Sequence, residues 1–161
     1  MGTGQQLITI AALALVTLLI LNVHQSTNQR LVEMYSNEAV IAGTGFAESM
    51  IDEIETKAFD QKTVSKVVTS VGGLTPANLL GPDPGEKTRA QFNDVDDYNN
   101  YVITDSLSRM GKFTIRVTVH YVVNFDPSVI SNYPTFAKRI NVFVTNNNFL
   151  DTLKISTVVA Y

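Results

Sequence analysis

The chain has 161 residues, a net charge of −3 and no cysteine. This length allows one modest globular domain once a terminal segment is set aside. The lack of cysteine excludes disulfides and thiolate chemistry, and the acidic balance gives no indication of nucleic-acid binding. The two histidines, His24 and His120, are too far apart in sequence to have the spacing of a metal site.

An apolar segment, Leu7 to Val23, begins almost at the N-terminus. It consists of Leu, Ile, Val and Ala apart from two threonines and one asparagine, and the first charged side chain is Arg30. As a helix, about 17–20 residues extend roughly 25–30 Å, the thickness of a bilayer core. A signal peptide is not favoured, because no Lys or Arg precedes the run and no A-x-A site follows it. We therefore expect the segment to be a permanent structural element.

An amphipathic pattern continues the helix beyond the apolar segment. Apolar residues recur every three or four positions, whereas the opposite face is acidic, and no proline occurs before Pro76. The pattern predicts one helix over the segment 1–56, with an apolar half at about 5–28 and an amphipathic half at about 29–56. The predicted buried stripe of the second half is Leu31, Tyr35, Ala39, Ala42, Phe46, Met50 and Ile54.

Two glycines, Gly43 and Gly45, interrupt the amphipathic half. Each costs about 1 kcal/mol relative to alanine in a helix interior. Two interpretations remain open: the helix is thinned there for close packing, or the pair forms a hinge.

A loop region is predicted over residues 57–111, because residues 72–87 are rich in Gly and Pro and residues 92–101 are polar and acidic. The acidic part offers the carboxylates of Asp94, Asp96 and Asp97. Hard cations such as Ca²⁺ bind oxygen ligands of this kind, although the spacing is not that of an EF-hand. The alternatives are a possible Ca²⁺ site and a solvated loop with Asx turns. No other cofactor is expected.

Strict alternation of apolar and polar residues predicts a strand from Phe113 to Phe125. Further strands are predicted over 138–145 and 152–161, separated by a turn of three asparagines. Three successive strands with short connections indicate an antiparallel β-meander over 112–161. With the loop region it forms a globular head, 57–161. The expected fold class is α+β, with the amphipathic half of the helix packed on the meander.

The order of these elements, together with the segments Phe92–Asn99 and Ala58–Asp60, resembles a type IV pilin or a type II secretion pseudopilin. The resemblance implies a structural subunit of a helical extracellular filament, a homopolymer whose precursor is held in the cytoplasmic membrane before pilus assembly machinery extracts it. It implies a polymerisation core in the N-terminal helix. In this chain that core comprises Gln5, Gln6, Leu7, Ile10, Leu13, Leu18 and Leu21.

The family places a glutamate near its mature N-terminus, where it pairs with a neighbour's terminal amine. This chain has no Glu before Glu33, so Gln5 and Gln6 are the strong polar side chains in that region. A neutral glutamine replaces the ion pair with hydrogen bonds and avoids the cost of a buried ion.

A second interpretation is a membrane-anchored binding module, either minor pilin-like or part of the envelope, that does not form the bulk fibre. An enzyme is not expected. The sequence contains no cysteine, no G-x-S-x-G motif and no phosphate-binding loop.

Overall fold

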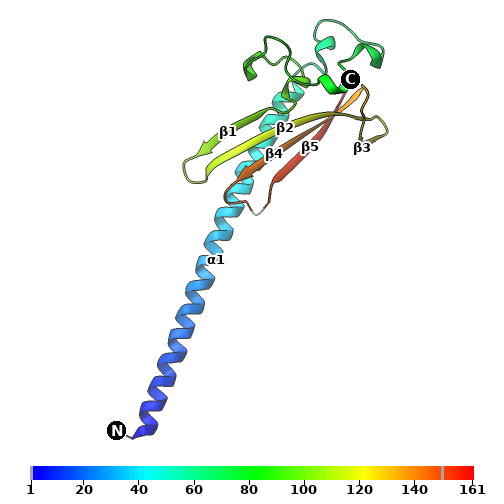
Figure 1. Ribbon diagram of the computed structural model, residues 1–161. Coiled ribbons are helices and arrows are strands. Elements are labelled where there is room, and N and C mark those ends of the chain that lie inside the picture. Colours follow the sequence, from blue (N-terminus) through cyan, green and yellow to red (C-terminus); the bar gives the residue numbers. More distant parts are fainter. Residues whose placement is uncertain (1, 150) are drawn as a thin grey trace. The chain divides into compact units, whose positions relative to one another are not determined.

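A computed structural model describes residues 2–149 and 151–161 (Figure 1). By its internal contacts the chain divides into two units, Met1–Glu38 and Ala39–Tyr161. Helix α1, Thr3–Glu55, contributes residues to both units. The predicted helical segment 1–56 also included Met1, which lies outside the described residues.

The first unit contains the apolar part of α1 and the beginning of its amphipathic part. Leucine and alanine, which are frequent here, have high helix propensity, whereas threonine competes for backbone groups. In the apolar segment, each threonine hydroxyl donates to the carbonyl four residues earlier, which does not displace the helical hydrogen bonds. Thr9 donates its hydroxyl to the carbonyl of Gln5 (2.7 Å), and Thr17 donates to that of Leu13 (2.8 Å). The helix therefore continues through both threonines.

The second unit contains an antiparallel sheet with the strand order β1-β2-β4-β5, and β3 pairs with the end of β2 (Figure 1). Together with α1 it confirms the α+β class. The strands are β1 Val102–Leu107, β2 Gly111–Val123, β3 Asp126–Ile130, β4 Ala137–Asn146 and β5 Leu153–Ala160.

The prediction of three strands was incomplete, because β1 and β3 were assigned to loops. β1 has little apolar alternation and lies within the predicted loop region 57–111. β3 contains Pro127, which normally argues against a strand and is tolerated at an edge. The strand predicted to end at Phe125 ends at Val123 after a register shift, and Phe125 is 93% exposed in the turn that follows.

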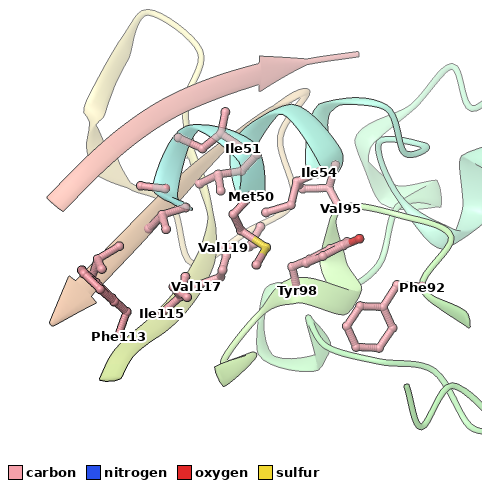
Figure 2. Close-up of a cluster of buried hydrophobic side chains, with 14 of the residues drawn as sticks. Met50, Ile51, Ile54, Phe92, Val95, Tyr98, Phe113, Ile115, Val117 and Val119 are labelled. Carbon is pink, nitrogen blue, oxygen red and sulfur yellow. The ribbon is translucent and has the colours of Figure 1, made fainter. Parts of the chain in front are cut away.

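The core of the second unit lies between α1 and the inward side chains of the sheet. Figure 2 shows Met50, Ile51 and Ile54 of the helix beside Val117 and Val119 of β2. The buried helix positions are Ala39, Gly43, Ala47, Met50, Ile51 and Ile54. Two members of the predicted stripe, Leu31 and Tyr35, are exposed, because burial along α1 begins only at Ala39.

The irregular region after α1 is tied into this core. Phe92, Val95 and Tyr98 are buried in it (Figure 2). The backbone of Ala58 accepts from the amide of Val95 (2.9 Å) and donates to the carbonyl of Asn93 (3.2 Å). These bonds fix the acidic segment against the end of the helix.

Candidate functional site

The apolar surface of α1 is the first candidate site. An 18-residue window of the helix has a mean hydropathy of 2.3, and none of it is buried within the chain. The helix is therefore long and apolar enough to cross a membrane. The same composition and length occur in membrane anchors and in signal sequences.

The residues predicted for the polymerisation core all lie on this surface. Both glutamines are exposed, and the apolar members expose 51–67% of their surface. Every residue of Leu7–Val23 is exposed, so no face of the segment is covered by the chain itself. A helix that is apolar on every side is typically buried in lipid or among other helices. The exposed apolar members are Leu7, Ile10, Leu13, Leu18 and Leu21.

The two glycines of α1 have different surroundings. A Cβ added at Gly43 would lie 2.6 Å from Cζ of Phe149, whereas one added at Gly45 would meet nothing within 4 Å. Gly43 therefore permits close packing of Phe149 on the helix. A hinge role for the pair, and for Gly45 in particular, stays a prediction.

The acidic segment is buried, so the predicted solvation of this loop was wrong, whereas the predicted Asx turn is present at Asp94. Asp94, Asp96 and Asp97 are at most 2% exposed. Oδ1 of Asp94 accepts from the amides of Asp96 (2.6 Å) and Asp97 (3.3 Å). Oδ2 of Asp97 accepts in return from the amides of Asn93 (2.8 Å) and Asp94 (3.1 Å). These reciprocal bonds hold the segment in a tight turn. One carboxylate oxygen of Asp94 and one of Asp97 are therefore already used as acceptors for backbone amides.

A buried lysine, Lys138 of β4, neutralises part of this charge. Its Nζ lies 3.1 Å from Oδ2 of Asp60, 2.7 Å from the carbonyl of Phe59, and in direct contact with Oδ1 of Asp96. Lys138, Asp60 and Asp96 have almost no solvent exposure. The ammonium thus makes three hydrogen bonds, the number its three protons allow. We call these three residues the Lys138 cluster.

Asp60 is the best-satisfied carboxylate of the cluster. The hydroxyl of Tyr121 donates to its Oδ2 (2.8 Å), and the amide of Lys62 donates to its Oδ1 (3.0 Å). Burial alone would raise the pKa of Asp60, but the charge of Lys138 and these donors lower it to about 2. Asp60 therefore remains a carboxylate at neutral pH.

The pKa values of Asp94 and Asp96 are shifted upward, in the direction opposite to that of Asp60. Burial, reinforced by Asp96 and Asp97, raises the pKa of Asp94 to about 8. Burial also raises the pKa of Asp96 to about 7, although Lys138 opposes the shift. One lysine cannot compensate every carboxylate here, so Asp94 is largely protonated at neutral pH.

Several buried oxygens of the acidic segment lack a hydrogen-bond partner within the described residues. They are Oδ1 of Asn93, Oδ2 of Asp94, Oδ2 of Asp96 and Oδ1 of Asp97. Free carboxylate oxygens are suitable ligands for Ca²⁺. Residues 2–149 and 151–161, however, contain no group of three or more acidic or histidine side chains placed to hold a metal ion. Calcium at Asp94, Asp96 and Asp97 stays a prediction.

Sequence reasoning missed Lys138 and Asp60. A signal was present for the lysine: it stands in phase with Ile140, Val142 and Val144, whose side chains all point inward. A charged residue at an inward position requires a buried partner. An acidic segment elsewhere in the chain was the obvious source of that partner.

No protein-family model matches the chain, and no curated protein or solved structure matches it either.

Proposed function

We propose that this chain is the structural subunit of a helical, extracellular filament of type IV pilus-like build, and that it is not an enzyme. The observation that carries the proposal is the apolar surface of Leu7–Val23, which the chain leaves uncovered on all sides. Before assembly the segment lies in the cytoplasmic membrane. In the fibre, helices of neighbouring subunits replace the lipid.

The threonines of the segment support this exchange of surroundings. Their hydroxyls are already bonded to helix carbonyls, so they require no partner from lipid or from a neighbouring helix. Because lipid tails are as apolar as leucine, the transfer itself has little hydrophobic driving force. Assembly machinery that performs work is therefore an expected partner.

The experiment that tests the proposal is electron microscopy of material sheared from cells that produce the chain. Thin fibres that carry the chain are expected from the wild type. Leu13→Asp should abolish them, because an unpaired charge among apolar helices costs several kcal/mol. Val67→Asp is the matched control, since Val67 is 80% exposed in the second unit and should tolerate the charge.

The main alternative is a membrane-anchored module that stays monomeric. In that case the wild-type chain would remain in the membrane fraction, and the sheared material would contain no fibre with this chain. Normal fibre yield from Leu13→Asp would also contradict the proposal.

A further inference from the structure

The outward face of the sheet is basic. Side chains alternate along each strand, and the inward ones form the core. Three bases, Lys112 and Arg116 of β2 and Lys154 of β5, are exposed on the outward side. Among the described residues of β1, β2, β4 and β5 the only acidic one is Asp105, which stands opposite the inward Phe113. We call Lys112, Arg116 and Lys154 the basic sheet face.

Two of these bases flank an aromatic ring. Phe143 of β4 is the cross-strand neighbour of both Arg116 and Lys154. The Lys154 ammonium lies 5.6 Å from the centre of the Phe143 ring. Because adjacent strands are about 4.8 Å apart, the two bases originate about 10 Å from each other. Arg139, also outward, donates to the carbonyls of Pro127 and Ser128 and is not counted in this face.

The helix layer of the same unit is acidic on its outer side. Glu48, Asp52 and Glu55 are exposed, and their spacing of four and three residues aligns them on one side of α1. The segment Ala39–Glu55 contains no Lys or Arg. At 1.5 Å per residue the three carboxylates extend about 10 Å along the helix. We call them the acidic helix ridge.

The acidic helix ridge and the basic sheet face have opposite charges, and each has three charged side chains. The ridge extends about 10 Å, and Arg116 and Lys154 are about 10 Å apart, whereas Lys112 lies about 13 Å from Arg116 along β2. Glu55 also accepts from the hydroxyl of Thr157 (3.0 Å), so Glu48 and Asp52 are the less engaged members of the ridge.

We propose that the basic sheet face of one subunit binds the acidic helix ridge of a second copy of this chain. The inference rests on the filament function proposed above and identifies one of its contacts. The core residues of α1 lie between the sheet and the ridge members Glu48 and Asp52, so these two carboxylates and the basic sheet face belong to opposite layers of the unit. A contact between different surfaces of identical subunits is heterologous, and it leaves a free surface at each end of any chain of copies. Such a contact propagates into a fibre unless the rotation between subunits closes a ring.

A second copy is the occupant that the charges favour. Each chain carries both the acidic helix ridge and the basic sheet face. When one of these surfaces is bound, the other stays free to bind the next subunit. A nucleic acid is a less suitable partner, because the net charge of −3 and the acidic helix ridge would repel its phosphates. Because both surfaces are exposed, salt should weaken the contact, with a screening length of about 10 Å at 0.1 M and about 3 Å at 1 M.

The test is charge reversal with rescue in the full chain, in cells that produce it. Arg116→Glu with Lys154→Glu should abolish fibres, and Glu48→Lys with Asp52→Lys should do the same. The variant that combines all four substitutions restores opposite charges and should restore fibres. Lys66→Glu with Lys87→Glu is the matched control, because these exposed lysines lie outside both surfaces. Fibres are counted by microscopy, the amount of chain in the membrane fraction shows whether each variant is retained, and urea unfolding in detergent shows whether its second unit is folded.

Each outcome decides the inference. Loss of fibres in both double variants and their return in the fourfold variant support the contact. Normal fibres from Arg116→Glu with Lys154→Glu, or no rescue by the fourfold variant, overturn the contact while the filament function stands. If the wild type makes no fibre, the filament function fails, and this contact fails with it.

Discussion

The Nζ of Lys138 lies 3.1 Å from Oδ2 of Asp60, although the two residues are 78 positions apart in the sequence. Both side chains are fully buried. This pair joins β4 to the segment that follows α1, and through Asp96 it also holds the acidic turn. A single ammonium thus connects three parts of the second unit.

Lys138→Met should destabilise the second unit strongly. The substitution keeps much of the volume but leaves Asp60 and Asp96 buried without their cation. Removal of one partner from a buried ion pair costs about 3–5 kcal/mol. The free energy of unfolding in urea, measured on the full chain in detergent, checks this. Lys154→Met is the control and should change it by less than about 0.5 kcal/mol, because Lys154 is exposed. Equal stability of the two variants would show that the cluster does not need its lysine.

Stability should fall as pH rises from about 4 to about 8. The folded protein raises the pKa of Asp94 to about 8 and that of Asp96 to about 7. An unfolded aspartate has a pKa of about 3.9, so in this window the folded state keeps protons that the unfolded chain has released. The slope is up to about 1.4 kcal/mol per pH unit for each such carboxyl. Asp60 acts oppositely: its pKa is about 2, so its stabilising effect is lost as pH falls from about 4 to 2.

Urea unfolding at a series of pH values measures this slope. Asp94→Asn imitates the protonated carboxyl and should remove the contribution of Asp94, which makes this variant more stable than the wild type at about pH 8. Asp52→Asn, at an exposed position, is the control and should keep the wild-type slope. A wild-type stability that rises between pH 5 and 8 would contradict the assigned protonation states.

Calcium offers another way to neutralise the acidic segment. If Asp94, Asp96 and Asp97 hold Ca²⁺, added calcium should raise the melting temperature and a chelator should lower it. A ligand at about 100 times its Kd stabilises the folded state by about 2.7 kcal/mol. The effect should be larger at about pH 8 than at pH 5, because the ligands must be ionised. Replacement of all three aspartates by asparagine should abolish it. A melting temperature indifferent to calcium at both pH values would leave protonation as the means of neutralisation.

The two glycines should respond differently to alanine. Gly45→Ala should stabilise α1 by about 0.5–1 kcal/mol, because a Cβ there meets nothing and alanine has the higher helix propensity. Gly43→Ala should be less favourable, since its Cβ would force Phe149 to move. Urea unfolding ranks the two variants. Fibre yield then tests the hinge: loss of fibres from the more stable Gly45→Ala would support it, whereas normal fibres would leave close packing at Gly43 as the sufficient explanation.

Gln5 and Gln6 should matter for assembly and not for folding. Gln5→Leu with Gln6→Leu removes the hydrogen-bonding side chains that precede the apolar segment, so fibres should form more slowly or melt at lower temperature. The unfolding of the second unit should be unchanged. Gln25→Leu with Asn28→Leu provides a matched loss of polar groups on the same helix. Fibres of the first variant as abundant and heat-resistant as those of the wild type would show that packing from Leu7 onward suffices.

The fold was predictable where periodicity was strong. Strict alternation located β2, and the three-to-four-residue repeat located the helix that covers it. β1 and β3 were not predictable, since each is short and is completed by pairing with β2. Their identity as strands depends on this partner rather than on their own side chains.

The buried electrostatics were harder to predict than the fold. An acidic segment is normally solvated, and the three carboxylates of residues 94–97 outweigh the single apolar Val95 in a sequence-based expectation. Burial follows from Lys138 on β4 and from Val95 and Tyr98, which anchor the same turn in the core. Contacts between segments far apart in sequence leave only an indirect trace, in this case a lysine at an inward strand position.

The hydroxyls of Thr9 and Thr17 donate hydrogen bonds to carbonyls of the same helix, so they need no acceptor from the surroundings of α1. A side chain with no unmet donor has the same hydrogen bonds in lipid as among protein helices. For these two residues the free energy of transfer from lipid to protein helices then depends only on van der Waals packing. This packing is similar in the two media. In the proposed filament these two threonines therefore add no barrier to the return of a subunit from the fibre to the bilayer, and the membrane would serve as a reservoir of reusable subunits.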